Sequence, residues 1–260
     1  MKARSLAIVA ALTGLLAHGA AGAAEVRVMI SGGLSAAYKQ LVPAFEAMTG
    51  HKVSTAYGPS MGTTEHAIPV RLARGEPADV LIMVGDALTK LIEQGKAIPA
   101  SRVDLVRSPI GVAVRAGAPK PDISTVEALR KALLAARSVA YSDSASGVYV
   151  ESQLFKTLGI EEEMKGKARM IPAVPVASIV AKGEAEIGFQ QISELLPVGG
   201  VEVVGPLPDA VQKITVFSAA VTANAQSPDA GKALIDFLAS ADAAPAIRKT
   251  GLEPLPATGR

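Results

Sequence analysis

The sequence of 260 residues contains no cysteine and no tryptophan. Without cysteine the chain forms no disulfide framework, and it offers no thiol for a lipid anchor at a processed N-terminus. Aromatic residues make up only 3% of the chain, whereas hydrophobic residues make up 49%. Aliphatic side chains must therefore supply most of the core, in one large domain or in two smaller lobes.

The sequence patterns of metal and nucleotide chemistry are also missing. No group of His, Asp and Glu has the spacing of metal ligands, and no glycine-rich loop ends in Lys followed by Ser or Thr. We therefore expect no bound metal and no cofactor. Any nucleotide hydrolysis must belong to another chain.

Basic residues are not in excess once the first residues are set aside. The chain has 26 Lys and Arg against 24 Asp and Glu, and Lys2 and Arg4 lie in a segment that we expect to be removed. The remaining chain is near neutral, which argues against a nucleic acid or an anionic membrane surface as partner. An anionic ligand would have to be held by local dipoles and hydrogen bonds.

Long hydrophobic runs are absent after the N-terminal segment. Lys2 and Arg4 precede an apolar run over residues 6–16, and residues 21–23 (Ala-Gly-Ala) have the small side chains of a cleavage site. Residues 1–23 are therefore predicted to be a secretory signal peptide, whose apolar part is too short to span a membrane. We expect a periplasmic protein that is monomeric and not inserted in a membrane.

Apolar runs and helical patterns alternate along most of the chain. This alternation is typical of βαβ units and predicts an α/β fold with parallel sheet covered on both faces. Strands are expected over 26–30, 52–57, 78–84, 139–141, 168–171, 186–190 and 201–204. Helices are expected over 34–48, from 63 onward, and over 87–94, 125–136, 148–158, 176–183 and 228–249.

Two longer apolar stretches predict a chain that crosses between two lobes. The first covers residues 104–115 and contains Pro109, and the second covers 212–222. We interpret both as crossing strands. The predicted domain organisation is a first lobe built from 24–108 plus 220–260 and a second lobe built from 109–219.

Three of the predicted strand-to-helix turns are rich in small and hydroxyl residues. In an open α/β sheet such turns lie beyond the carboxyl ends of the strands, where ligands bind, and the first amides of a helix can hold an anion. Taken singly, each turn is explained by helix capping. Together they favour a shared anion-binding cleft. The turns are Ser31-Gly32-Gly33, Ser60-Met61-Gly62 and Ser144-Ala145-Ser146-Gly147.

The order of these segments resembles that of periplasmic molybdate-binding proteins. The matching segments include the Ser31 and Ser60 turns, residues 75–80 (Gly-Glu-Pro-Ala-Asp-Val), 146–149 (Ser-Gly-Val-Tyr) and 188–191 (Gly-Phe-Gln-Gln). This resemblance covers nearly the whole chain after residue 23. It implies the type II periplasmic binding fold, in which two crossing strands join two α/β lobes. It also implies that an oxyanion is held by Ser31, Ser60, Ser146, Val176 and Gln191.

The chain departs from that family's pattern around the expected ligand. Gln191 stands where the family usually has Tyr, Ala145-Ser146-Gly147 replaces a Pro-Ala-Gly turn, and extra residues lie between Ser60 and Gly75. A compact cage for a tetrahedral anion would be opened by these changes. An Arg side chain pairs with a carboxylate through two parallel hydrogen bonds, so an organic acid fits better. Further donors expected at the cleft are Tyr141, Ser142, Ser144, Tyr149, Gln190 and Arg71.

In other details the chain is similar to bacterial aconitate isomerases, which place an isomerase site in the same fold. The similar segments are residues 59–62, 67–69 and 141–149. Such a reaction needs a base that takes a proton next to a carboxylate, and donors that stabilise the enolate. His66 and Tyr149 are the candidate bases, with Glu65 behind them. His66 could equally be a solvated helix residue, and Tyr149 a packed ring.

Residues 58–62 (Gly-Pro-Ser-Met-Gly) match the Gly-x-Ser-x-Gly pattern of a nucleophilic serine. A serine hydrolase is disfavoured because His51 opens the preceding strand and His66 is expected on the helix that follows Ser60. Arg71 could be a surface cation on the same helix. Gln190 and Gln191 are more informative, since two amides at the end of an apolar strand are costly to bury without partners.

The sequence thus predicts a solute-binding protein that captures a small organic di- or tricarboxylate for a transporter of the ABC class. An aconitate isomerase is the alternative, which the lack of an obvious base places second. A molybdate receptor is the third interpretation.

Overall fold

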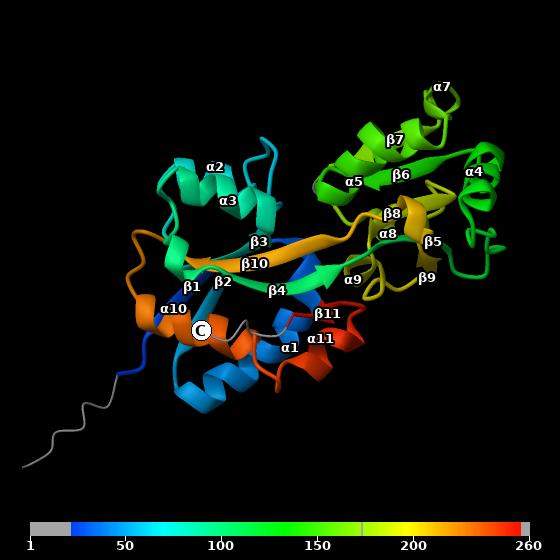
Figure 1. Cartoon of the computed structure of the whole chain (residues 1–260). Helices are drawn as coiled ribbons and strands as arrows, with labels where there is room; N and C mark the ends of the chain where they lie inside the picture. The colour runs from blue at the N-terminus through cyan, green and yellow to red at the C-terminus, as the bar shows by residue number, and fades with distance from the viewer. Residues whose placement is uncertain (1–21, 173, 256–260) are drawn as a thin grey trace, which may run out of the picture.

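The computed structural model describes residues 22–172 and 174–255, so most of the predicted signal peptide lies outside the described residues. Two β-sheets form two lobes that lie side by side (Figure 1). The first sheet has six strands in the order β11-β4-β10-β3-β1-β2, and the second has five in the order β7-β6-β8-β5-β9. The predicted α/β fold with two lobes is confirmed.

The first sheet is parallel only in part. β1 pairs in parallel with β2 and β3, whereas β10 runs antiparallel to β3 and β4. The expected parallel pairing is found for β1, β2 and β3, whereas β10 is antiparallel because a strand that returns from the other lobe enters the sheet from the opposite end. The strands are β1 (Glu25–Ile30), β2 (Lys52–Tyr57), β3 (Val80–Val84), β4 (Val103–Ser108), β10 (Thr215–Val221) and β11 (Glu253–Pro254).

Helices cover both faces of this sheet, with α2 and α3 on one side and α1, α10 and α11 on the other (Figure 1). β3 is buried on both faces. Its residues alternate between two hydrophobic clusters, with Ile82 in one and Leu81 and Met83 in the other. The helices are α1 (Gly32–Thr49), α2 (Ile68–Ala73), α3 (Gly85–Glu93), η1 (Pro99–Ser101), α10 (Pro228–Leu238) and α11 (Ala244–Lys249).

The second sheet repeats this plan. β6 is parallel to β7 and β8, and β5 is antiparallel to β8 and β9. Its strands are β5 (Ile110–Arg115), β6 (Val139–Ser142), β7 (Ala168–Ile171), β8 (Ile187–Gln191) and β9 (Val201–Pro206). Its helices are α4 (Val126–Ala135), α5 (Ala145–Tyr149), η2 (Val150–Leu154), α6 (Phe155–Thr157), α7 (Glu161–Met164), α8 (Val176–Ala181), α9 (Ile192–Leu195) and η3 (Asp209–Val211).

Proline decides two of the differences from the predicted elements. Residues 58–67 form a loop, and the expected helix begins only at Ile68, with Pro69 in its first turn. The stretch 104–115 is not one strand. Pro109 separates β4 from β5, which belong to different sheets.

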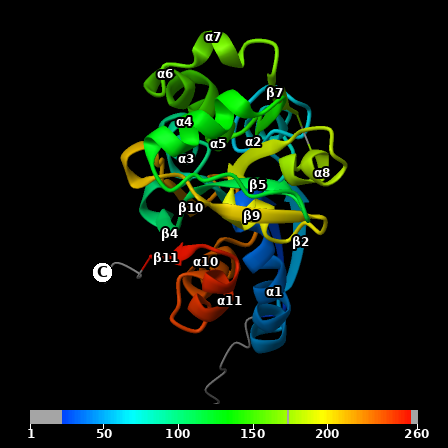
Figure 2. The ribbon, with the colours of Figure 1, turned by 90° about the vertical axis from the view of Figure 1, so that its right-hand side faces the viewer.

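Gln212 links the two crossing segments through its side-chain amide. The Gln212 side chain accepts a hydrogen bond from the Ile110 amide at 2.9 Å and donates one to the Ile110 carbonyl at 3.0 Å. Figure 2, seen from the side of the second lobe, shows β5 and β9 in front of the first lobe. In the described part of the chain, no helix has the length and apolar character to cross a membrane.

Candidate functional site

A cavity of about 370 Å³ lies where the two lobes face each other. Its walls are the segments that follow β1 and β2 in the first lobe and β6 and β8 in the second. These are carboxyl ends of strands, as expected for a ligand site in an α/β sheet. The predicted site residues that line the cavity are Ser31, Gly32, Ser60, His66, Ser142, Ser144, Gln190 and Gln191.

The first turn provides a buried hydroxyl at the start of α1. Ser31 is 4% exposed, and its Oγ has no hydrogen-bond partner among the described residues. Ser31 is also the N-cap of α1, although its side chain caps none of the first amides of this 18-residue helix. A buried hydroxyl without a partner is costly, so Ser31 Oγ is suited to bind a ligand in the cavity. The positive end of the α1 dipole favours an anion there.

The second turn is anchored to β3. Ser60 Oγ accepts a hydrogen bond from the Val84 amide at 2.9 Å, which leaves its own hydrogen available for an acceptor. Met61 and Gly62 lie outside the cavity lining, and Thr64 joins it with a buried Oγ1 that has no partner among the described residues. In the part of the chain that the structure describes, no histidine is hydrogen-bonded to Ser60, so the nucleophile arrangement is not assembled.

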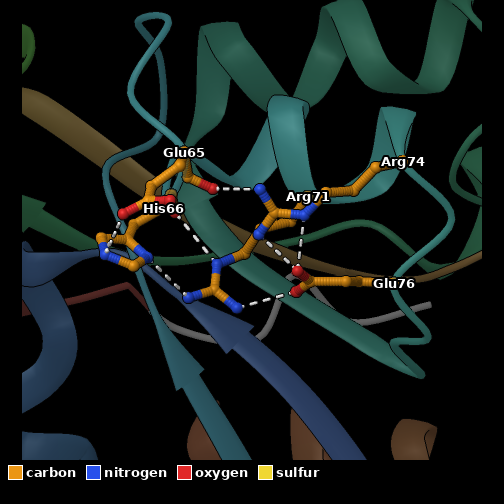
Figure 3. Close-up of polar contacts among 5 residues, drawn as sticks. All are labelled: Glu65, His66, Arg71, Arg74 and Glu76. Atoms are coloured by element: carbon orange, nitrogen blue, oxygen red, sulfur yellow. Dashed lines mark hydrogen bonds and ion pairs between the residues drawn. The ribbon is translucent and has the colours of Figure 1, made fainter.

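Arg71 does not reach the cavity lining. Its Nη1 donates to Glu76 at 2.7 Å, and its Nε donates to the His66 carbonyl at 3.2 Å (Figure 3). Its Nη2 lies 3.3 Å from His66 Nδ1, which must accept because a guanidinium only donates. Figure 3 shows these residues joined to Arg74 and Glu65 in one polar network. The Arg71 guanidinium is thus directed to Glu76 and to His66, which lines the cavity.

The third turn directs its hydroxyl groups toward one another. Ser142 Oγ lies 2.9 Å from both Ser144 Oγ and Ser146 Oγ. Ser146 and Gly147 sit behind the lining, where a Cβ at Gly147 would come within 1.6 Å of the Ser142 carbonyl oxygen. This close approach requires glycine. The residues of this segment that line the cavity are Ser142, Asp143, Ser144 and Ala145.

The two predicted tyrosines are bound elsewhere in the second lobe. Tyr141 donates to Glu151 at 3.0 Å, and Tyr149 donates to the Val211 carbonyl at 2.7 Å. Burial raises the pKa of both hydroxyls, that of Tyr141 to about 12. Neither ring lines the cavity. This placement corrects the interpretation of Tyr149 as a base, because its hydroxyl already donates to a carbonyl and its anion is disfavoured.

Both glutamines at the end of β8 line the cavity with their amides engaged. Gln190 Oε1 accepts from the Val176 amide at 2.9 Å, so Val176 supports the site without lining it. In the orientation that satisfies both ends of its amide, Gln191 donates to Ser108 Oγ at 2.8 Å and accepts from Thr215 Oγ1 at 2.9 Å. Gln191 therefore joins the two crossing segments.

Glu194 is the functional candidate that the sequence did not reveal. It lies on α9, one turn beyond the two glutamines, and its carboxyl group lines the cavity. Burial raises the pKa of Glu194 to about 7, although hydrogen bonds from the Gln190 side chain and the Gln191 amide lower it. The nearby charge of Asp143 raises it further. A carboxyl group of this kind exists in both protonation states at neutral pH.

Lys39 is the second residue that sequence reasoning missed. Ser31, Ser35 and Lys39 all line the cavity, and their spacing of four places them on one face of α1. Lys39 Nζ lies 4.9 Å from the centre of the Tyr57 ring, which also lines the cavity. The spacing of four residues is the feature of the sequence from which Lys39 could have been predicted. No His, Asp or Glu side chains gather in groups of three suited to a metal ion anywhere in 22–172 or 174–255.

Comparison with known proteins adds a family to this geometry. A family model described as bacterial extracellular solute-binding protein matches residues 26–253. The chain is 51% identical to an aconitate isomerase from Pseudomonas sp. over 251 residues, which cover 96% of this chain and 95% of the relative. It is 29% identical to a molybdate-binding protein from Azotobacter vinelandii over 255 residues, which cover 94% and 95% of the two chains.

Solved structures show the same fold. The periplasmic molybdate-binding protein from Azotobacter vinelandii superposes with a TM-score of 0.68 at 22% identity. The superposition covers 89% of this chain and 99% of that one. Together with the two sheets and the crossing segments, this likeness confirms the type II periplasmic binding fold.

Proposed function

This chain belongs to the family of bacterial extracellular solute-binding proteins, and we propose that its cleft binds aconitate and interconverts the cis and trans isomers. The observation that carries the proposal is the likeness to a relative named aconitate isomerase along nearly the full length of both chains. The sequence alone favoured a receptor because it offered no base. The Glu194 carboxyl group, which lines the cavity and has a raised pKa, answers that objection.

The cavity has donors suited to a ligand with several carboxylates. One carboxylate is proposed to bind at the start of α1, where Ser31 Oγ lacks a partner and the helix dipole is positive. A second is proposed to lie near Lys39, two helical turns further along the same wall, with His66 nearby in the lining. This spread of donors supports a tricarboxylate better than a single tetrahedral oxyanion.

Proton NMR of the purified protein with trans-aconitate tests the proposal. We expect cis-aconitate to appear until both isomers reach a constant ratio, and the same ratio to be approached from cis-aconitate. A Ser31→Ala variant should convert more slowly, whereas Ser152→Ala, whose hydroxyl donates to Val148 on the outer side of the second lobe, should match the wild type. Saturable binding without conversion would exclude the isomerase and leave a receptor.

A receptor that delivers its ligand to an ABC-class transporter is the second candidate, supported by the shared fold with molybdate-binding proteins. In that case the chain would be a monomer in the periplasm, released after removal of residues 1–23, with a membrane permease as its partner. Titration calorimetry with molybdate and with trans-aconitate separates the two ligand classes. Tight binding of molybdate alone would support the third interpretation, an oxyanion receptor.

A further inference from the structure

We propose that Glu194 is the catalytic residue that takes the proton from one carbon of aconitate and returns it to another. This inference rests on the proposed function, because it assigns a role within that reaction. Glu194 belongs to the second lobe, and its carboxyl group contacts Gly32 in the cavity wall of the first lobe.

The position of Glu194 is set by contacts between the lobes. Ser193 Oγ donates to the Gly33 carbonyl at 2.6 Å, which fixes α9 against the start of α1. A Cβ at Gly32 would lie 1.8 Å from Glu194 Oε1, so the carboxyl group packs directly against the Gly32 backbone. Glu194 is therefore held beside the same turn that is proposed to bind a substrate carboxylate. A base beside that substrate carboxylate also lies beside the methylene carbon of the substrate, which loses the proton.

The neighbours of Glu194 keep its carboxyl group reactive. Gln190 donates to it and is itself fixed by the Val176 amide, and the Gln191 backbone amide donates as well. Asp143 faces it from the turn after β6. Lys39 and His66 line the same cavity from the first lobe, and they are the basic side chains of that lining. Burial and Asp143 raise the pKa of Glu194 to about 7, which matches a group that must both accept and donate a proton near neutral pH.

The reaction balances with one carboxyl group. The ionised Glu194 removes a proton from the methylene group of trans-aconitate, so the C–H bond breaks and its electron pair enters the adjacent π system. The resulting enolate is delocalised over both ends of the three-carbon allyl unit and its carboxylates. The protonated Glu194 then donates the same proton to the opposite end, where a C–H bond forms and the double bond has moved. No oxidant, reductant or co-reactant is needed.

Other candidate groups fit this role less well. Tyr149 and Tyr141 donate to the Val211 carbonyl and to Glu151, outside the cavity. His66 Nδ1 is occupied by Arg71, and its side chain is 57% exposed. Asp143 shares the cavity with Glu194, so it is the alternative that the experiment has to separate.

The test measures conversion of trans-aconitate and its pH dependence in Glu194→Gln, Glu194→Asp, Asp143→Asn and a control, Glu151→Gln, which removes a carboxylate outside the lining. We expect Glu194→Gln to lower kcat by about 10²-fold or more. Its affinity for trans-aconitate by calorimetry should stay within about threefold of wild type, which also shows that it folds. The control should match the wild type.

The pH profile distinguishes a catalytic from a structural role. We expect kcat/KM of the wild type to fall below about pH 7, because the base must be ionised. In Asp143→Asn this fall should move to lower pH, since the charge that raises the pKa of Glu194 is gone. Glu194→Asp should keep partial activity with a shifted fall. In D₂O, Glu194→Gln should leave the methylene protons of trans-aconitate unexchanged.

The outcomes separate two failures. If the wild type converts no aconitate, the proposed function is wrong. If the wild type converts it and Glu194→Gln does so at a similar rate, the proposed function stands and the assignment of Glu194 is overturned. Loss of activity in Asp143→Asn, with Glu194→Gln still active, would assign the proton transfer to Asp143 instead.

Discussion

Two carboxyl groups of the protein, the buried Asp79 and the half-buried Glu194, have opposite surroundings. Asp79 directly precedes β3, at the amino end of the strand, and is 1% exposed. It accepts from the amides of Arg27 at 2.7 Å, Gln226 at 2.6 Å and Ser227 at 3.1 Å. Glu194 lies at the cavity, where burial opposes its charge and Asp143 repels it.

The difference supports a structural role for Asp79 and the proposed catalytic role for Glu194. Away from the cavity, Asp79 joins the start of β1 to the start of α10 through backbone donors that satisfy its charge. At the carboxyl ends of the strands, Glu194 keeps a charge that the fold tolerates poorly, as expected of a reacting group. The hydrogen-bond donors and the neighbouring charges tell the two carboxyl groups apart.

Removing Asp79 should have the largest effect on stability. Asp79→Ala leaves three backbone amides without their acceptor, and we expect the free energy of unfolding to fall by about 3 kcal/mol or more. Urea denaturation measures this. Asp79→Asn keeps one acceptor oxygen and should lose less. A loss below about 1 kcal/mol in Asp79→Ala would contradict the structural role of this carboxylate.

Above neutral pH, Glu194→Gln should raise the free energy of unfolding, whereas removal of Asp79 lowers it. The pKa of Glu194 is raised in the folded protein, from 4.5 to about 7, so its neutral form is favoured on folding. The wild type therefore has this contribution to stability below about pH 4.5 and loses it as the pH rises through 7. The variant should be more stable than the wild type by about 2 kcal/mol at pH 8, and similar at pH 4.5. Melting temperatures at both pH values check this. Equal melting temperatures at pH 8 would remove the contrast with Asp79.

Lys39→Gln should weaken trans-aconitate binding about tenfold, because one charge-assisted contact is lost. Calorimetry at low and high salt measures the effect, which should shrink as salt screens the charge. Lys131→Gln on the exposed side of α4 is the matched control. An unchanged affinity in Lys39→Gln would mean that no ligand carboxylate lies near this end of the cavity.

Arg71→Lys should have the smallest effect. Arg71 contacts Glu76 and His66 and does not line the cavity. We therefore expect the free energy of unfolding to fall by about 0.5–1 kcal/mol and the affinity for trans-aconitate to fall less than threefold. A tenfold loss of affinity would restore the interpretation from sequence, in which Arg71 forms two parallel hydrogen bonds to a substrate carboxylate.

Sequence patterns predicted the features that depend on residues close together in the chain, namely strands and the turns that follow them. The strands before the three turns were found from apolar runs, and Ser31, Ser60 and Ser144 follow them into the cavity. The direction of a side chain was harder to predict. Tyr149 lies on the predicted helix, but its hydroxyl turns to Val211, which is far along the chain.

Glu194 could not be found in this way because its role depends on long-range packing. Residues 192–196 (Ile-Ser-Glu-Leu-Leu) contain no motif of a functional site. Only the docking of α9 on Gly32 and Gly33, some 160 residues earlier, brings the carboxyl group to α1. β11 was missed for a related reason. A strand of two residues is too short to show the alternation of apolar and polar side chains that predicts a strand. Its pairing with β4 is set by the fold of the first lobe.

A crystal structure of the Glu194→Gln variant with trans-aconitate bound tests the central claim most directly. The expected result is a ligand in the cavity with one carboxylate at Ser31 and its methylene carbon about 3–3.5 Å from the side chain at position 194. A ligand bound with its methylene group turned away from that side chain, or bound outside the cavity, would contradict the assignment of this cleft as an isomerase site with Glu194 as its base.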